Sequence, residues 1–196
     1  MGRTMGFYDL HDAMAQPGCP VCRLKADAVD RSIDILLWEN VNDPGARQNI
    51  RQARGFCHQH AWQLIQGGAS SGSVIIMRDV VQNVLAVLEN ARLEPAGPAQ
   101  FFRRTQPAAT AELAADLAPQ VPCPICVQAE AVESALIATL VEGLPGENGL
   151  LEAYRASEGL CLPHLRQALS TARDPAPSPR RWWRRRSLSG EDWRPT

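Results

Sequence analysis

The chain carries two copies of one set of side chains that suits a soft metal ion, three cysteines and one histidine. The first set is Cys19, Cys22, Cys57 and His60, and the second is Cys123, Cys126, Cys161 and His164. Both have the spacing Cys-x2-Cys-x34-Cys-x2-His, and a shift of 104 residues superposes them. Structural zinc sites hold Zn²⁺ in a tetrahedron of such ligands. The pattern therefore predicts two Cys3His metal sites.

The cysteine count favours metal over disulfides. All 6 cysteines belong to the two sets, so each set has an odd number of thiols and an added histidine. We predict zinc, two ions per chain. An iron–sulfur cluster is the less favoured alternative, because the Cys-x2-Cys-x2-Cys spacing of ferredoxins is absent. Redox chemistry at the Cys-x2-Cys pairs is another alternative, but a thioredoxin-like site would need a βαβ setting that the sequence does not predict.

The sequence predicts no catalytic group. Four protein ligands leave no open metal position for water or substrate, which is typical of a structural site. We expect His11 and His58 to lie at the surface. No carboxylate pair is kept between the two copies, and we find neither a Gly-rich phosphate loop nor a serine in a nucleophile elbow. We therefore predict that the protein is not an enzyme.

The two sets belong to an internal duplication, since 11 positions of residues 19–65 are identical in the second copy. After Cys22 and Cys126, apolar residues recur at three- and four-residue steps, which predicts a helix in each copy. "NVNDPG" and "GLPGENG" break these helices, and a shorter helical stretch then ends at Gly55 or Gly159. The Cys-x2-His element opens the next helix, where Pro163 fits the first turn.

Each repeat is thus predicted to be a helical hairpin whose two ends one metal ion clips together. Closure within a repeat is the simplest arrangement, and we expect it. The spacing also permits a swapped arrangement, in which Cys19 and Cys22 join Cys161 and His164. Arg51 and Arg155 occupy equivalent places and could offset the negative charge of the two sites.

Residues 73–93, "SVIIMRDVVQNVLAVLENARL", form the clearest predicted helix, with Ser73 as N-cap and a broad apolar stripe that we expect to pack in a core. The predicted fold is all-α: two duplicated metal-clipped helical hairpins bridged by this long central helix. The predicted segments are the first repeat (1–72), the bridging helix (73–93), a linker with a short helix (94–118), the second repeat (119–173) and a disordered Arg/Trp-rich tail (174–196).

The composition of the chain excludes few classes of function. The chain has 196 residues, 45% of them hydrophobic, and a formal charge of −1, which gives no bulk reason to expect nucleic acid or membrane as partner. No run of 18 apolar residues occurs, so we expect no transmembrane segment. The start lacks a signal-peptide core, so we expect a cytoplasmic protein. In the tail, arginines interleaved with tryptophans suit nucleic-acid backbones and bases, so nucleic acid could bind through residues 180–196.

The segment "GCPVCRLKADAVDRSIDILLWENVNDPGARQNIRQARGFCHQHAWQLI", followed by "SGSVIIMRDVVQNVLAVLE", resembles an uncharacterised prokaryotic family, domain-of-unknown-function family 6062. The resemblance covers about residues 7–170 and rests on the duplicated CPxC…GFCxxH layout. The second copy departs slightly, with "GLCLPH" in place of GFCxxH, but keeps every ligand. The resemblance implies the metal sites and no established activity.

From the residues we predict a non-enzymatic zinc-binding helical scaffold or adaptor with two structural Cys3His sites and another protein as partner. The alternatives are an iron–sulfur or thiol redox protein, and a nucleic-acid-binding protein that uses the tail.

Overall fold

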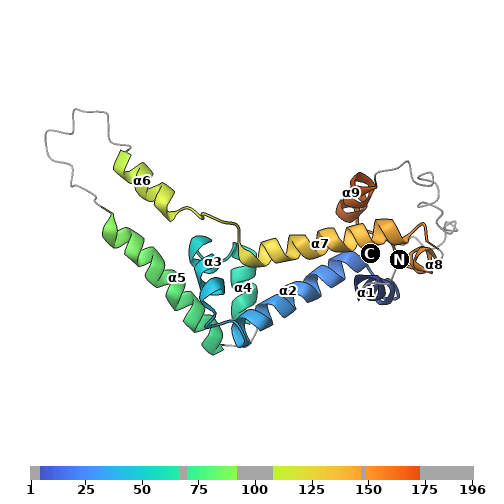
Figure 1. Cartoon of the computed structure of the whole chain (residues 1–196), viewed down its shortest axis with the longest axis horizontal. Coiled ribbons are helices and arrows are strands. Elements are labelled where there is room, and N and C mark those ends of the chain that lie inside the picture. Colours follow the sequence, from blue (N-terminus) through green and yellow to red (C-terminus); the bar gives the residue numbers. More distant parts are fainter. Residues whose placement is uncertain (1–4, 67–69, 92–107, 147–148, 173–196) are drawn as a thin grey trace, which may run out of the picture. The chain divides into compact units, whose positions relative to one another are not determined.

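The structure, a computed structural model, describes residues 5–66, 70–91, 108–146 and 149–172. Over these ranges it contains nine helices and no strand, which confirms the all-α prediction (Figure 1). The helices are α1 (Met5–Met14), α2 (Pro20–Trp38), α3 (Pro44–Gln52), α4 (His58–Gln66), α5 (Ser70–Asn90), α6 (Ala108–Leu117), α7 (Pro124–Gly143), α8 (Leu150–Ala156) and α9 (Leu162–Thr171). The predicted tail and residues 94–107 of the predicted linker lie outside the described residues.

Proline marks several of the helix starts, because its fixed φ suits the first turn and its missing N–H has no helical partner there. The prolines in first turns are Pro20, Pro44, Pro124 and Pro163. In α3, Asp43 is the N-cap, and its Oδ1 accepts a hydrogen bond of 2.7 Å from the backbone N–H of Ala46. The predicted stop glycines Gly55 and Gly159 follow α3 and α8 with positive φ angles of 104° and 83°.

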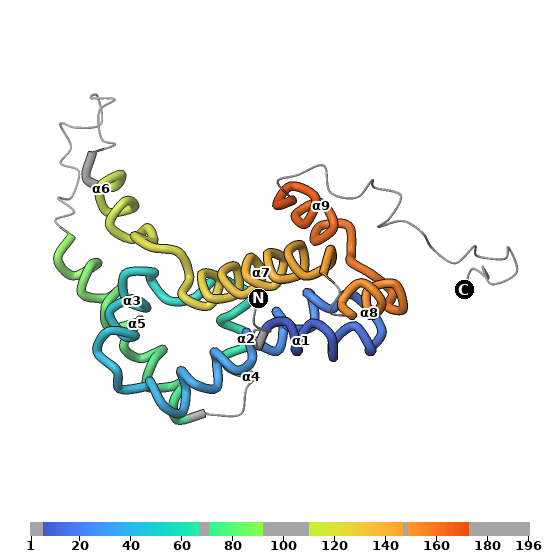
Figure 2. Tube along the Cα trace, turned by 45° about the vertical axis from the view of Figure 1, so that its right-hand side comes forward, coloured from blue at the N-terminus to red at the C-terminus, as the bar shows by residue number. Residues whose placement is uncertain are grey.

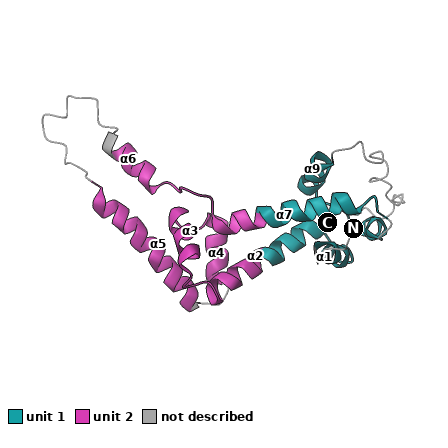
Figure 3. Ribbon diagram, in the orientation of Figure 1, with its two compact units in different colours: residues 1–28, 130–196 teal, residues 29–129 magenta. Residues whose placement is uncertain are grey.

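The chain divides into two compact units, residues 1–28 with 130–196 and residues 29–129 (Figure 3). We call them unit 1 and unit 2. Both boundaries fall inside a helix, one in α2 and one in α7. The predicted bridging helix, here α5, lies entirely in unit 2, and its role as a connection between two hairpins stays a prediction. The units also do not follow the repeats, because each unit contains residues of both copies.

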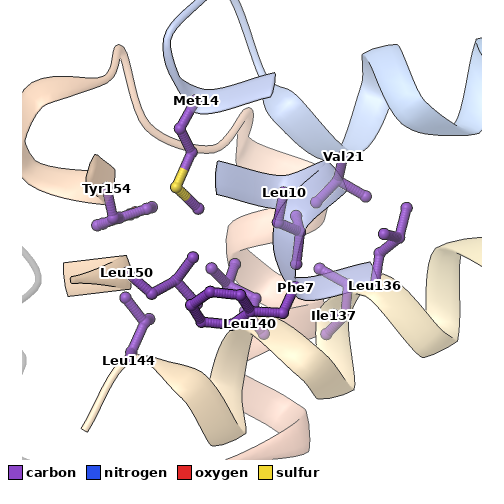
Figure 4. Packing of buried hydrophobic residues seen from close by; sticks show 11 residues of the cluster. Phe7, Leu10, Met14, Val21, Leu136, Ile137, Leu140, Leu144, Leu150 and Tyr154 are labelled. Carbon is purple, nitrogen blue, oxygen red and sulfur yellow. The ribbon is translucent and has the colours of Figure 1, made fainter. Parts of the chain in front are cut away.

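The core of unit 1 is built from α1, the start of α2, the later part of α7, α8 and α9 (Figure 4). Its buried residues are Phe7, Leu10, Met14, Val21, Leu136, Ile137, Leu140, Leu144, Leu150, Tyr154 and Ala168. Helix α1 was not predicted, although Phe7, Leu10 and Met14 have helical spacing. It lies beside α8, from the other end of the chain (Figure 2).

The core of unit 2 gathers residues of α2, α3, α4, α5 and the first turns of α7: Val29, Ile33, Leu36, Leu37, Ile50, Leu64, Ile76, Val80, Ile125 and Ala129. The stripe predicted on α5 packs only in part, since Val80 is buried while Val74, Val81, Leu85 and Leu88 are 43–65% exposed. Ser73 is also not the N-cap. It lies in the first turn of α5, and its hydroxyl donates to the carbonyl of Leu64.

Two helices are long and apolar enough to cross a membrane, over Ser71–Asn90 and Pro124–Gly143. Length and composition are weak evidence, because the core helix of a soluble protein passes the same test. Helix α7 contributes buried residues to both cores and has cysteines of the second set at its start. The expectation of no transmembrane segment stays a prediction.

Candidate metal sites

The first cluster, which we call site A, lies in unit 1 and consists of Cys19, Cys22, Cys161 and His164. The Nδ1 atom of His164 lies 3.3 Å from the Sγ of Cys19, 3.3 Å from that of Cys22 and 3.1 Å from that of Cys161. The Sγ atoms of Cys22 and Cys161 are 3.6 Å apart. His164 is buried, whereas Cys22 is exposed.

The second cluster, site B, lies in unit 2 and consists of Cys57, His60, Cys123 and Cys126. The Nδ1 atom of His60 lies 3.2, 3.6 and 3.3 Å from the Sγ atoms of Cys57, Cys123 and Cys126, respectively. The Sγ atoms of Cys126 and Cys57 are 3.6 Å apart. No ligand atom of this cluster belongs to an exposed residue.

All eight predicted side chains therefore come together, but the expected closure within each repeat is wrong. Each site joins the CPxC pair of one repeat to the CxxH pair of the other. After Cys22 the chain continues along the 19 residues of α2, about 28 Å, away from the ligand pair at the start of that helix. The start of α2 belongs to unit 1, whereas Cys57 and His60 belong to unit 2.

Every ligand pair sits at a helix N-terminus. The carbonyl groups of Cys19, Cys57, Cys123 and Cys161 each accept the first hydrogen bond of the helix that follows, from the residue four positions on. The second ligand of each pair is three residues later, so it lies in the first turn on the same face. Unpaired backbone N–H groups and the helix dipole stabilise negative charge there. Two helix starts meet at each site, an arrangement suited to thiolates.

The distances fit a tetrahedral ion. With metal–sulfur bonds of about 2.3 Å and metal–nitrogen bonds of about 2.05 Å, a tetrahedron has S···S edges of about 3.8 Å and S···N edges of about 3.6 Å. The S···S distances of 3.6 Å and the S···N distances of 3.1–3.6 Å are close to these edges. A disulfide would need S–S distances near 2.05 Å. The six cysteines are free.

The protonation of the thiols also favours a metal ion as the occupant of each site. Although the residue as a whole is exposed, desolvation of the Cys22 thiol, together with the neighbouring thiols of Cys161 and Cys19, raises its pKa to about 12. Burial and the thiols of Cys57 and Cys123 likewise raise the pKa of Cys126 to about 12. Three thiols this close cannot all ionise unaided, because their charges repel. A divalent cation removes this repulsion, so the donor set is suited to a positively charged ion.

Site A has an additional acid–base pair beside its histidine. The Nε2 atom of His164 lies 2.8 Å from Oε1 of Glu133, and Nζ of Lys25 lies 2.5 Å from Oε2 of the same carboxylate. Burial opposes ionisation of Glu133, but the hydrogen bonds and charges of Lys25 and His164 outweigh it and lower its pKa. This role for Glu133 was not predicted from the sequence, because the matching position in the first repeat is Val29 and the two copies share no carboxylate there.

The other residues considered from sequence lie elsewhere. His58 is exposed, and its ring makes an edge contact with Trp62. His11 is also exposed, and its Nδ1 lies 3.6 Å from Oδ1 of Asp12. Arg51 forms an ion pair of 2.8 Å with Asp79 of α5. The basic side chain near site A is instead Lys25, the single lysine of the chain.

The chain is similar to a curated protein and matches the model of a protein family. It is 38% identical over 65 residues to an uncharacterised 23.9 kDa protein in the xynA 3′ region of Caldicellulosiruptor sp. (strain Rt8B.4), a match that covers 33% of this chain and 32% of that protein. The chain thus matches about a third of that relative's length. No solved structure matches it. Residues 1–180 match a family of unknown function, DUF6062. The chain, a helical protein with two Cys3His clusters able to hold metal ions, therefore belongs to the DUF6062 family.

Proposed function

We propose that this protein is a non-enzymatic zinc-binding scaffold or adaptor in which two structural Cys3His sites fix the arrangement of the helices. The observation that carries the proposal is the closed ligand set. In each site, four protein atoms lie within 4.8 Å of one another, and three S···N distances and one S···S distance are close to the edges of a tetrahedron. Catalysis at zinc requires an open coordination position for water or substrate. A tetrahedral ion held by all four protein atoms has no such position.

The sequence distance between the ligand pairs supports a structural role. Cys19 and His164 are 145 residues apart, and His60 and Cys126 are 66 residues apart. An ion shared by such distant segments closes long loops, and its binding free energy becomes folding free energy. The packed helices include α3 and α8 with 9 and 7 residues, and helices of that length are marginal on their own.

The adaptor part of the proposal is supported by the surface of α5. Val81, Leu85 and Leu88 are 52%, 47% and 43% exposed at helical spacing. Apolar side chains gathered on one exposed face are typical of a surface that binds another protein. Loss of a copurifying partner in a Val81→Glu/Leu85→Glu variant that still binds two metal ions would support this role. Retention of the partner would contradict it.

Metal content and folding test the zinc proposal together. Full-length protein prepared without a metal-chelating tag should contain two zinc ions per chain and be colourless. Removal of zinc by a strong chelator should lower the helical circular dichroism signal at 222 nm, and stoichiometric zinc should restore it. Iron with visible absorption bands after anaerobic purification would instead support the iron–sulfur alternative. Full helicity without metal would refute a structural role.

The proposed cytoplasmic location agrees with six cysteines that are free and arranged for metal binding, since thiols stay reduced in that compartment. Nucleic-acid binding through residues 180–196 stays a prediction. Truncation after residue 173 should abolish binding and its salt dependence if the prediction holds. A truncated chain that binds as well as the full chain would refute it.

A further inference from the structure

Sites A and B have the same ligands but different surroundings. Beside site A, the buried ring of His164 contacts Glu133 through Nε2 at 2.8 Å, and Lys25 binds the other oxygen of that carboxylate. The repeat equivalents of Glu133 and Lys25 are Val29 and Ala129, which belong to the apolar core of unit 2. The carboxylate and the lysine are therefore particular to site A.

The contact with Glu133 determines which nitrogen of His164 is free to bind a metal ion. An ionised carboxylate can only accept hydrogen bonds, so Nε2 of His164 carries the proton. In a neutral imidazole the other nitrogen, Nδ1, then has a lone pair. That atom faces the three Sγ atoms of site A at 3.1–3.3 Å. The hydrogen bond thus selects the tautomer that the site needs.

The same contact fixes the orientation of the ring. Nδ1 and Nε2 lie on opposite sides of the imidazole, so a carboxylate anchored at Nε2 holds Nδ1 on the sulfur side. Glu133 is itself held, because Lys25 Nζ lies 2.5 Å from Oε2 and the carboxylate side chain is only 17% exposed. A carboxylate that accepts from a ligand imidazole also makes the other nitrogen a stronger donor to metal.

Resting on the proposed zinc-binding function, we propose that Glu133 is a positioning residue that fixes His164 as an Nδ1 ligand and makes metal retention at site A depend on a carboxylate. At site B the position equivalent to Glu133 is Val29, and the ligands Cys57, His60, Cys123 and Cys126 belong to the other unit, so Glu133 itself serves site A alone. Removal of Glu133 should weaken metal binding at site A 10–100-fold, the usual range for loss of such a partner. Site B should be unaffected.

Histidine-ring NMR of the zinc-loaded full chain can follow the two sites separately, since the chain has only 4 histidines. Each ring nitrogen reports whether it carries a proton or a metal ion. In the wild type, we expect His164 to show a protonated Nε2 and a metal-bound Nδ1. During titration with a competing chelator, Glu133→Ala should lose the His164 metal signal at a 10–100-fold lower chelator concentration, with the His60 signal unchanged. Glu133→Gln keeps an acceptor oxygen and should show an intermediate loss.

Two control variants separate positioning from general stability. Glu130→Ala removes an exposed carboxylate one turn earlier on α7 and should behave as wild type. Lys25→Met breaks the ion pair but leaves the carboxylate–imidazole contact, so it should weaken site A clearly less than Glu133→Ala. Equal effects of Lys25→Met and Glu133→Ala, equal loss at both sites, or no effect of Glu133→Ala would each overturn the proposal. Absence of zinc from both sites in the wild type would instead refute the proposed function.

Discussion

Gly72 is a position where a single added methyl group should reverse the usual effect of a helix substitution. It lies in the first turns of α5, and a Cβ atom there would be 2.6 Å from the carbonyl oxygen of Leu37 at the end of α2. The carbonyl carbon and Cα of Leu37 would both be 3.3 Å away. These are backbone atoms, so a side-chain rotation cannot relieve the overlap. The two helices approach each other closely because residue 72 has no side chain.

Two effects of opposite sign decide the outcome of Gly72→Ala. Alanine favours a helix interior over glycine by about 1 kcal/mol. Restoring an ordinary contact requires the distance to grow from 2.6 Å to at least 3.4 Å, a movement of about 0.8 Å in a packed core. Overpacking of this kind costs roughly 1–3 kcal/mol. We therefore expect a net destabilisation of up to about 2 kcal/mol and a fall in Tm of up to roughly 8 °C.

Gly6 of α1 is the matched control, because a Cβ there would make only an ordinary contact of 3.8 Å with Oγ1 of Thr139. Gly6→Ala should leave the metal-loaded protein as stable as the wild type or more stable by up to about 1 kcal/mol. Urea unfolding followed by circular dichroism measures both variants. If Gly72→Ala stabilises the protein as much as Gly6→Ala does, the close approach of α2 and α5 is wrong.

Three further predictions follow from the cores, an ion pair and the thiols. Leu140→Ala, at a side chain with no exposure in the core of unit 1, should cost about 2–5 kcal/mol in urea unfolding, whereas Leu169→Ala, at a side chain 49% exposed, should cost far less; equal losses would contradict the packing. Burial opposes ionisation of Asp79, but its hydrogen bonds to Arg51 and Arg47 outweigh this and lower its pKa below 3.8. An Asp79 carboxylate with a lowered folded-state pKa stabilises the protein above its unfolded-state pKa, and this stabilisation is lost as pH falls through the folded-state pKa. Asp79→Asn should therefore flatten the acid side of the stability–pH curve below about pH 4, and an unchanged slope would refute the pairing. Because the pKa of Cys22 lies near 12 without metal, zinc binding at pH 7 should release protons, measurable as buffer-dependent heat in calorimetry; heat independent of the buffer would contradict thiol protonation.

Residue type and spacing predicted the eight side chains that the structure gathers into two clusters, and Gly55, Gly159 and Pro163 predicted helix boundaries. Those signals are local, since Cys-x2-Cys or Cys-x2-His at a helix start needs only one turn of chain. Local sequence does not decide which ligand pairs share a site, because the repeat spacing is identical for both pairings.

Glu133 shows a second limit of the sequence argument. A duplication draws attention to what its copies share, and Glu133 differs from Val29 at the matching position. The single lysine, Lys25, three residues after Cys22, was a usable signal, because a lysine one helical turn from a predicted ligand can hold a carboxylate beside the site. The sequence also could not predict that half of the apolar stripe on α5 is exposed. Helical periodicity shows that one face of a helix is apolar, but it does not show whether another element covers that face.

The pairing of ligands across the repeats is tested most directly by metal counts of two double variants. Cys22→Ala/Cys161→Ala removes two ligands of site A alone, so this protein should retain one zinc ion per chain. Cys22→Ala/Cys57→Ala removes one ligand from each site, so both sites should bind weakly, and little zinc should remain after gel filtration. The opposite result, zinc lost from the first variant and one ion retained by the second, would show closure within each repeat and contradict the structure.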